Sequence, residues 1–297
     1  MKYSFLDDTL LSRLGSLPLE ARVPMMGNVV GKHSSLHRGS SVEFAEYRNY
    51  VPGDDTRRLD WKAFARSDRY YIKEFEADTN LRAYFIIDAS GSMNFASTGE
   101  PKIQIARRIA ATLAYLLVNQ GDAAGLSICT DKLHLEVPAS RRPAHLERFF
   151  SSLNQVEPAG KTGLLKAIHE VAEKISQRAW VVILSDFFTD VSELGDALQH
   201  LRYRKHDIAV FHLMDPLELD FKFDRPRRFV DMEDGTVLIS EPNLIAQEYH
   251  AAMNEFLTSV RDLSHDASAD YRLVRTDAEL EPLLRDFLTA RLPKSKG

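Results

Sequence analysis

The sequence predicts an α/β protein whose main domain is a mostly parallel β-sheet with helices on both faces. From Leu81 onward, short apolar runs of strand length alternate with longer segments of helical periodicity, which is the pattern of parallel sheets. Two of these runs, 84–87 and 180–184, are apolar at every position, as expected for strands that are buried on both faces. At 297 residues the chain can form one large domain or two modest ones.

The individual elements of this main domain follow in order along residues 81–292. Strands are predicted at 82–88, 123–129, 180–185, 207–213 and 270–274, with a lesser one at 132–137. Helices are predicted at 102–119, 143–153, 164–176, 191–204, 242–264 and 279–291. The turn Glu233-Asp234-Gly235 between strand patterns at 227–232 and 236–240 predicts an inserted β-hairpin. Residues 293–297 form a short tail.

Residues 1–80 are predicted to form a smaller, β-containing amino-terminal segment that packs on the main domain. A helix is expected at 8–20, a loop at 23–41 and strands at 44–51 and 69–75, with a tight turn at 52–55. Arginine and acidic side chains alternate around that turn: Arg48, Arg57, Arg58, Arg66, Glu43, Glu46, Asp54, Asp55 and Asp60. They predict an ion-pair lattice around Trp61 as a buried apolar anchor. A partner-binding surface is the alternative.

The first candidate functional residues follow the strand predicted at 82–88. Asp88, Ser90 and Ser92 place a carboxylate and two hydroxyls directly after it, where ligands bind in open α/β sheets. Such oxygen ligands suit Mg²⁺ or Mn²⁺. Asp and Ser are also favoured as helix caps, so for these three residues alone both interpretations stay open.

Two later residues strengthen the metal-site interpretation. Thr162 opens a predicted helix, and Asp186 ends a second buried strand. The set Asp88, Ser90, Ser92, Thr162 and Asp186 resembles the metal-ion-dependent adhesion site of von Willebrand factor type A domains. The resemblance implies that the serines and the threonine ligate the metal directly or through water, and that the aspartates complete the shell. It also implies one open position for an Asp or Glu carboxylate of a partner protein.

A second resemblance lies upstream. The string from Arg48 to Trp61, R-N-Y-V-P-G-D-D-T-R-R-L-D-W, is similar to the signature of the bacterial domain-of-unknown-function family fifty-eight (DUF58). In that family a conserved amino-terminal segment precedes a von Willebrand A-like domain. The resemblance implies a MoxR-type AAA+ ATPase as a partner, in chaperone-like assembly of client proteins or metal insertion into them.

The composition indicates which classes of partner and which cellular compartment to expect. The net charge is −5, with 27% charged residues, so we expect no nucleic-acid partner, which would require a concentrated basic face. The single cysteine, Cys129, lies in an apolar run and is expected to be inert packing. No apolar run approaches the ~18 residues of a membrane span and no secretory-signal pattern opens the chain. We therefore expect a cytoplasmic protein without a membrane span.

No catalytic constellation is found in the sequence. Gly160-Lys161-Thr162 imitates the end of a phosphate-binding loop, but Gln155 stands where the first glycine is required. The leading hypothesis is therefore a non-enzymatic, metal-dependent protein–protein interaction module. One alternative is a metal-dependent hydrolase with Asp131 or Asp190 as general base. The other is a structural scaffold without metal.

Overall fold

The structure, a computed structural model, describes residues 3–19, 43–51, 61–67, 69–76, 81–131, 134–223 and 225–292. The chain divides into two compact units, one of residues 1–22 and 82–297 and one of residues 23–81. The loop predicted at 23–41 and the tail at 293–297 lie outside the described residues. Each unit is described by itself.

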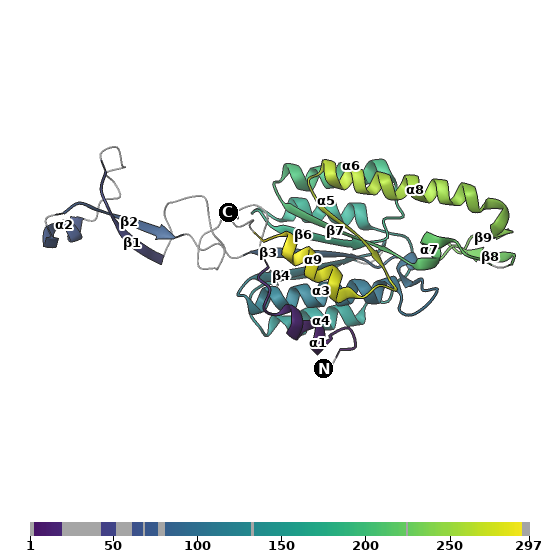
Figure 1. The fold of residues 1–297 in the computed structure, drawn as a ribbon, viewed down its shortest axis with the longest axis horizontal. Coiled ribbons are helices and arrows are strands. Elements are labelled where there is room, and N and C mark those ends of the chain that lie inside the picture. The colour runs from purple at the N-terminus through teal and green to yellow at the C-terminus, as the bar shows by residue number, and fades with distance from the viewer. Residues whose placement is uncertain are drawn as a thin grey trace. The chain divides into compact units, whose positions relative to one another are not determined.

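Six strands form the sheet of the larger unit, in the order β10–β7–β6–β3–β4–β5 (Figure 1). Their bounds are β3 (Arg82–Asp88), β4 (Ala123–Cys129), β5 (His134–Ser140), β6 (Trp180–Ser185), β7 (Asp207–Met214) and β10 (Asp270–Arg275). All neighbouring strands are parallel except β5, which is antiparallel to β4. The predicted α/β fold with a mostly parallel sheet is confirmed.

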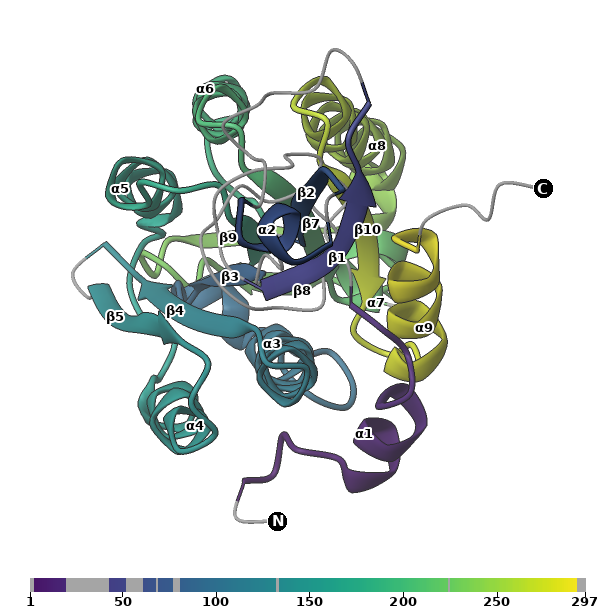
Figure 2. The ribbon, with the colours of Figure 1, turned by 90° about the vertical axis from the view of Figure 1, so that its left-hand side faces the viewer.

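Helices cover both faces of this sheet (Figure 2). One face carries α3 (Lys102–Asn119), α4 (His145–Gln155) and α9 (Leu280–Ala290), and the other carries α5 (Leu164–Lys174), α6 (Val191–Tyr203) and α8 (Pro242–Asp266). Side chains alternate between the two faces along each strand. Phe85 meets Phe149 of α4 edge to face, whereas its neighbour Ile86 belongs to the core formed with α5, α6 and α8.

The amino terminus of the chain packs on this larger unit. The sequence had instead predicted one amino-terminal segment over residues 1–80. Helix α1 (Asp8–Leu14) contacts α3 and α9. Gln120 ties the next residues down, because its Nε2 donates to the Leu17 carbonyl at 3.0 Å and its Oε1 accepts from Leu19 N–H at 3.1 Å. The helix predicted over 8–20 ends at Leu14.

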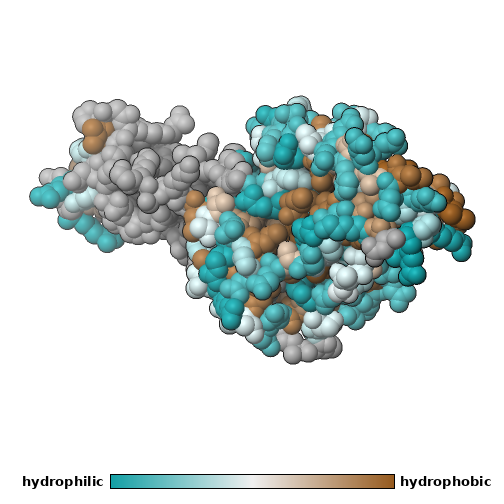
Figure 3. Space-filling view, turned by 45° about the vertical axis from the view of Figure 1, so that its right-hand side comes forward, coloured by the Kyte–Doolittle hydropathy of each residue, from teal (hydrophilic) through white to brown (hydrophobic). Residues whose placement is uncertain are grey.

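The predicted hairpin lies between β7 and β10 in the chain. Strands β8 (Arg227–Val230) and β9 (Val237–Ser240) pair antiparallel, next to the short helix α7 (Pro216–Asp220) at one end of the sheet (Figure 1). Apolar side chains gather on the surface there (Figure 3); Leu238 is 60% exposed and Ile239 is 77% exposed. None of the helices in the described ranges combines the length and the apolarity needed to cross a bilayer.

The smaller unit contains β1 (Glu43–Asn49), α2 (Trp61–Ser67) and β2 (Tyr71–Glu76), with β1 and β2 paired antiparallel. Within it, Phe64 stacks on Tyr70 with ring centroids 4.5 Å apart. The prediction of a buried Trp61 is wrong: its side chain is 61% exposed and meets the edge of the Phe64 ring. Residues 52–60 of the proposed lattice lie outside the described residues.

The buried imidazole of His206 predicts a pH dependence of stability. His206 is 6% exposed and its Nδ1 accepts from Ala179 N–H at 3.2 Å; burial, aided by Arg204, lowers its pKa to about 4. Since the unfolded chain binds this proton with the ordinary histidine pKa of 6.5, the unfolded state gains protons first as the pH falls. The free energy of unfolding should therefore decrease between pH 6.5 and about 4, by an amount on the order of 3 kcal/mol from this group.

We expect His206→Asn, which keeps an acceptor for Ala179 but does not titrate, to show a shallower decrease. Urea denaturation of both proteins at several pH values across this window measures it. Identical pH profiles for the two proteins would contradict the prediction.

Candidate functional site

The site lies where the winding of the sheet reverses direction. The chain begins the sheet in its middle at β3, winds outward to β4 and β5, and then returns to β6 on the other side of β3. Ile87 pairs with Leu184, so Asp88 and Ser185 end two neighbouring strands. The carboxyl ends of strands at such a switch point border the crevice in which ligands bind in doubly wound sheets.

Asp88 is the centre of a hydrogen-bond network in this crevice. Its Oδ1 accepts from the Ser90 N–H at 2.9 Å. Its Oδ2 accepts from the hydroxyls of Thr162 at 2.9 Å and Ser185 at 2.8 Å. Asp88 is 1% exposed; burial and the nearby Asp186 carboxylate raise its pKa to about 6, against the lowering effect of the hydrogen bonds. The network fixes the orientation of both carboxylate oxygens.

The two predicted serines follow on a short 3₁₀ helix. The Ser90 and Ser92 hydroxyl oxygens are 3.1 Å apart, and Gly91 between them opens the helix η2 (Gly91–Asn94). The Gly91 N–H donates to the Gly160 carbonyl at 2.9 Å, which joins this loop to the segment before α5. Ser92 also lines the neighbouring cavity.

Thr162 is held by the close packing of the loop that precedes α5. A Cβ on Gly163 would lie 2.2 Å from the Thr130 carbonyl oxygen, so a larger residue at that position would force the two loops apart. The Asp131 N–H donates to the Lys161 carbonyl at 2.8 Å. Thr162 therefore has a fixed place, from which its hydroxyl reaches Asp88.

Asp186 lies beside this network but is bound to a different partner. Its Oδ2 accepts from Lys102 Nζ at 2.7 Å, and Lys102 also binds Glu218 of α7 at 2.6 Å. Lys102 is fully buried at the start of α3, with its ammonium 5.1 Å from the centroid of the Phe188 ring. The two carboxylates oppose desolvation and leave the lysine pKa raised. Lys102 therefore fixes the position of Asp186 and offsets its charge.

Of the five predicted residues, the structure joins four in one hydrogen-bonded network. Ser90 and Thr162 donate directly to Asp88, and Ser92 joins through the Ser90 hydroxyl. Asp186 lies outside these hydrogen bonds, and its charge adds to the larger effect of burial in raising the Asp88 pKa. The network places three side-chain hydroxyls beside two carboxylates.

Sequence reasoning missed three residues of the site: Ser185, Lys102 and Glu233. Ser185 had a signal, since it directly precedes Asp186 at the end of a buried strand; its hydroxyl also accepts from the Phe187 N–H at 2.8 Å. Phe187 itself has a positive φ of 56°, a strained conformation of the kind found at functional sites. Lys102 had no signal, because it begins an ordinary helical pattern.

Glu233 comes from the β8–β9 turn. Its pKa is raised to about 7 by burial and by the charges of Asp88, Asp186 and Asp231, with Lys161 acting in the opposite direction. Glu233, a residue of the turn, therefore interacts electrostatically with both aspartates of the site.

The donor set fits a hard divalent cation. Two carboxylates and three hydroxyls offer only oxygen atoms, which Mg²⁺ and Mn²⁺ prefer. A cation would oppose the burial and the Asp186 charge that together raise the Asp88 pKa. Within the described ranges, no group of three or more His, Cys, Asp or Glu side chains could hold an ion. A metal here would therefore depend on the serine and threonine hydroxyls.

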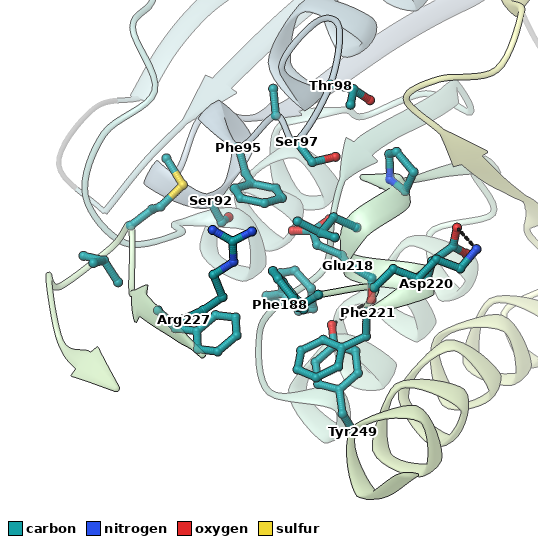
Figure 4. A pocket seen from close by; sticks show the side chains of 18 of the residues that line it. Ser92, Phe95, Ser97, Thr98, Phe188, Glu218, Asp220, Phe221, Arg227 and Tyr249 are labelled. Atoms are coloured by element: carbon teal, nitrogen blue, oxygen red, sulfur yellow. Dashed lines mark hydrogen bonds and ion pairs between the residues drawn. The ribbon is translucent and has the colours of Figure 1, made fainter. Parts of the chain in front are cut away.

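A cavity of about 1030 Å³ opens beside the site (Figure 4). Its wall includes Phe95, Phe188 and the pair Phe221 and Tyr249, whose rings stack with centroids 3.8 Å apart. The Arg227 side chain points into the cavity toward Ser92 and Phe95. The cavity thus extends from the candidate metal site to a wall of aromatic side chains.

The two general bases considered for a hydrolase differ in their surroundings. Asp190 caps α6, since its Oδ1 accepts from Ser192 N–H at 2.9 Å and Glu193 N–H at 3.0 Å. The Ser192 hydroxyl, which donates to the same oxygen at 2.6 Å, and these backbone hydrogen bonds lower the Asp190 pKa. The low pKa makes Asp190 a poor general base near neutral pH. Asp131 is exposed and lies against Gly160, whose added Cβ would come within 2.7 Å of the Asp131 Oδ1.

The fold and the site define an α/β protein with a cluster of carboxylates and hydroxyls at the switch point of a doubly wound sheet. Residues 46–256 match the family model described as "Protein of unknown function DUF58". The chain belongs to the DUF58 family.

Similar proteins include the uncharacterized protein Rv1480 of Mycobacterium tuberculosis, 28% identical over 235 residues that cover 78% of this chain and 73% of that protein. The uncharacterized protein YeaD of Bacillus subtilis is 30% identical over 98 residues, or 33% of this chain and 23% of YeaD. Among solved structures, the conserved hypothetical protein BatB from Bacteroides thetaiotaomicron has a TM-score of 0.49 at 13% identity, covering 71% of this chain and 98% of BatB. The SpRpn10 VWA domain has a TM-score of 0.41 at 12% identity, covering 74% of this chain and 98% of that domain.

Proposed function

We propose that this protein is a metal-dependent protein–protein interaction module that binds Mg²⁺ or Mn²⁺ and captures a partner carboxylate. The observation that carries the proposal is the network around Asp88 at the switch point of the sheet. The Ser90 N–H and the hydroxyls of Thr162 and Ser185 donate to this aspartate, and a second buried carboxylate, that of Asp186, lies nearby. Ser92 connects this network to the cavity, which supplies a route for a partner side chain.

In this proposal each residue has a defined task. Asp88 and Asp186 supply the negative charge, while Ser90, Ser92 and Thr162 supply neutral oxygen atoms. Lys102 holds Asp186 through its 2.7 Å ion pair, so that carboxylate is positioned before any ligand arrives. A bound ion would supply a positive charge that attracts the carboxylate of a partner Asp or Glu.

The partner is proposed from the family resemblance. The DUF58 signature implies a MoxR-type AAA+ ATPase or its client, with the protein acting as an adaptor in chaperone-like assembly. The cavity of about 1030 Å³ beside the site is large enough to receive residues that flank the captured carboxylate. Capture would then depend on both the metal and the neighbouring side chains of the partner.

Calorimetric titration with Mn²⁺ and Mg²⁺ tests the metal site. We expect saturable one-site binding to the wild type and a loss of more than tenfold in affinity for Asp88→Asn, since even outer-shell changes cost about 10–100-fold. Asp190→Asn is the matched control: it removes the same charge, and asparagine still caps α6. Equal affinities for all three proteins would contradict the proposal.

A metal-free scaffold is the second candidate, and the buried Lys102 favours it. The single lysine charge already pairs with the carboxylates of Asp186 and Glu218, so part of the negative charge in the crevice is offset without an ion. In a scaffold, neither metal would bind to the wild type, and Asp88→Asn would change stability alone. The same titration therefore separates the two candidates.

A further inference from the structure

One face of the β8–β9 hairpin packs against the aromatic side chains of the cavity. Successive residues of a strand point to opposite faces, so Arg227 and Phe229 of β8 share one face. The Phe229 ring stacks on Phe221 with centroids 6.0 Å apart and meets Phe223 edge to face at 5.3 Å. The face that carries Arg227 is therefore the one turned toward the cavity.

The Arg227 side chain extends into the cavity from this face. Its guanidinium lies 5.9 Å from the centroid of the Phe223 ring, and the side chain points toward Ser92 and Phe95 (Figure 4). It forms no ion pair or hydrogen bond with any of the residues that the structure describes. A cation that faces Ser92 without a counter-charge favours an anionic ligand at that place.

Several other charged groups that line the cavity are compensated by one another. Arg275 binds Asp220 at 3.2 Å and Asp277 at 3.1 Å. Glu218 binds Lys102 at 2.6 Å. The carboxylates of α7, those of Glu218 and Asp220, therefore already bind other cations.

Two acidic residues of the β8–β9 turn also line the cavity, Asp231 and Glu233. The Asp231 Oδ1 accepts from the N–H groups of Glu233 at 2.7 Å and Asp234 at 3.2 Å. Burial, and after it the charges of nearby aspartates, raise the pKa of Glu233 to about 7, so this carboxyl is partly protonated at neutral pH. Arg227 thus keeps its positive charge available for a ligand.

We propose that the cavity recognises a partner segment in which an acidic residue stands next to a bulky apolar residue, and that Arg227 binds the acidic carboxylate. This inference rests on the proposed function and adds the sequence preference of the partner. The carboxylate lies between the guanidinium and Ser92, where Arg227 donates charge-assisted hydrogen bonds to it. The apolar side chain packs against the stacked rings of Phe221 and Tyr249, a preformed apolar surface.

Short peptides without terminal charges test the preference by calorimetry in the presence of saturating Mn²⁺. The probes are acetylated and amidated Gly-Ser-Gly peptides with a central Asp-Phe pair or, for the other order, a Phe-Asp pair. We expect saturable binding of at least one of them. Alanine in place of phenylalanine should weaken it about tenfold, because less apolar surface is buried. Asparagine in place of aspartate should weaken it at least as much.

Arg227→Gln tests the role of the guanidinium, with Arg225→Gln as the matched control. Both arginines are exposed, but of the two only Arg227 lines the cavity. We expect Arg227→Gln to bind the aspartate peptide about tenfold more weakly or worse, and Arg225→Gln to bind it as the wild type does. For the asparagine peptide, the wild type and Arg227→Gln should have equal affinities, because the carboxylate that the guanidinium recognises is gone.

The outcomes separate this inference from the proposed function, because Mn²⁺ binding is titrated separately for each protein and circular dichroism checks each fold. With Mn²⁺ bound, equal affinities of the wild type and Arg227→Gln for the aspartate peptide would overturn the role of Arg227 alone. Equal losses in Arg227→Gln and Arg225→Gln would reduce the effect to surface charge and also overturn it.

The peptide comparison decides the apolar half of the preference. Binding of neither phenylalanine peptide to the Mn²⁺-loaded wild type, or equal binding of the alanine peptide, would overturn it. Absence of Mn²⁺ binding to the wild type would overturn the proposed function and this inference with it.

Discussion

Arg291→Met is expected to lower the free energy of unfolding by about 3–5 kcal/mol, because it removes one member of a buried ion-pair triad. The Arg291 guanidinium binds Asp207 at the start of β7 and Asp270 at the start of β10. It also lies 4.7 Å from the centroid of the Trp180 ring in β6. One side chain at the end of α9 thus joins three adjacent strands, and its loss leaves two buried carboxylates without this cation.

Urea denaturation measures this effect, with Arg285→Met as the matched control on the same helix. Arg285 pairs with Glu281 one turn away at 2.9 Å, but its side chain is 44% exposed, so its loss should cost only about 0.3–0.5 kcal/mol. Adding Asp207→Asn and Asp270→Asn to Arg291→Met should recover part of the stability if charge is the cause. Equal stabilities for Arg291→Met and Arg285→Met would contradict the prediction.

Lys102→Met is expected to have a comparable effect, about 3–5 kcal/mol, centred on the site. The methionine fills a similar volume but leaves Asp186 and Glu218 buried without the ammonium that now binds both. In the proposed metal module, the extra negative charge should make Mn²⁺ raise the melting temperature of Lys102→Met by more than that of the wild type.

Thermal denaturation with and without Mn²⁺ measures both effects. Lys174→Met is the matched control, since Lys174 also contacts two carboxylates, those of Glu136 at 2.6 Å and Glu170 at 3.5 Å. Its side chain is 54% exposed, so we expect a loss below about 1 kcal/mol. A Lys102→Met protein as stable as Lys174→Met would contradict the prediction that the buried ion pairs of Lys102 stabilise the fold.

Local patterns in the sequence predicted the elements of the main domain well. The apolar run 180–184 and the periodic segment 102–119 correspond to β6 and α3 with nearly the predicted bounds. They could be told apart because a strand buried on both faces is a short continuous apolar run, whereas a helix repeats its apolar residues every three or four positions. The amino terminus was harder: no local pattern shows that residues 3–19 belong with a sheet that begins at residue 82.

In the candidate site, too, some features followed from local sequence patterns and others did not. The proximity of Asp88, Ser90 and Ser92 was predictable, because all three directly follow the end of one strand within five residues. The predicted burial of Trp61 failed, because a tryptophan in a polar string gives no local indication of what covers it.

The sequence by itself determined the strands, the helices, the hairpin and the order of polar residues at the strand ends, since these depend on contacts a few residues apart. Only the tertiary structure decided which distant charges meet. Lys102 and Asp186 are 84 residues apart in the chain, and Glu233 reaches the site from an inserted turn. Such pairings depend on strand order and on burial of the whole fold, and the desolvation that makes them strong does not exist in the unfolded chain.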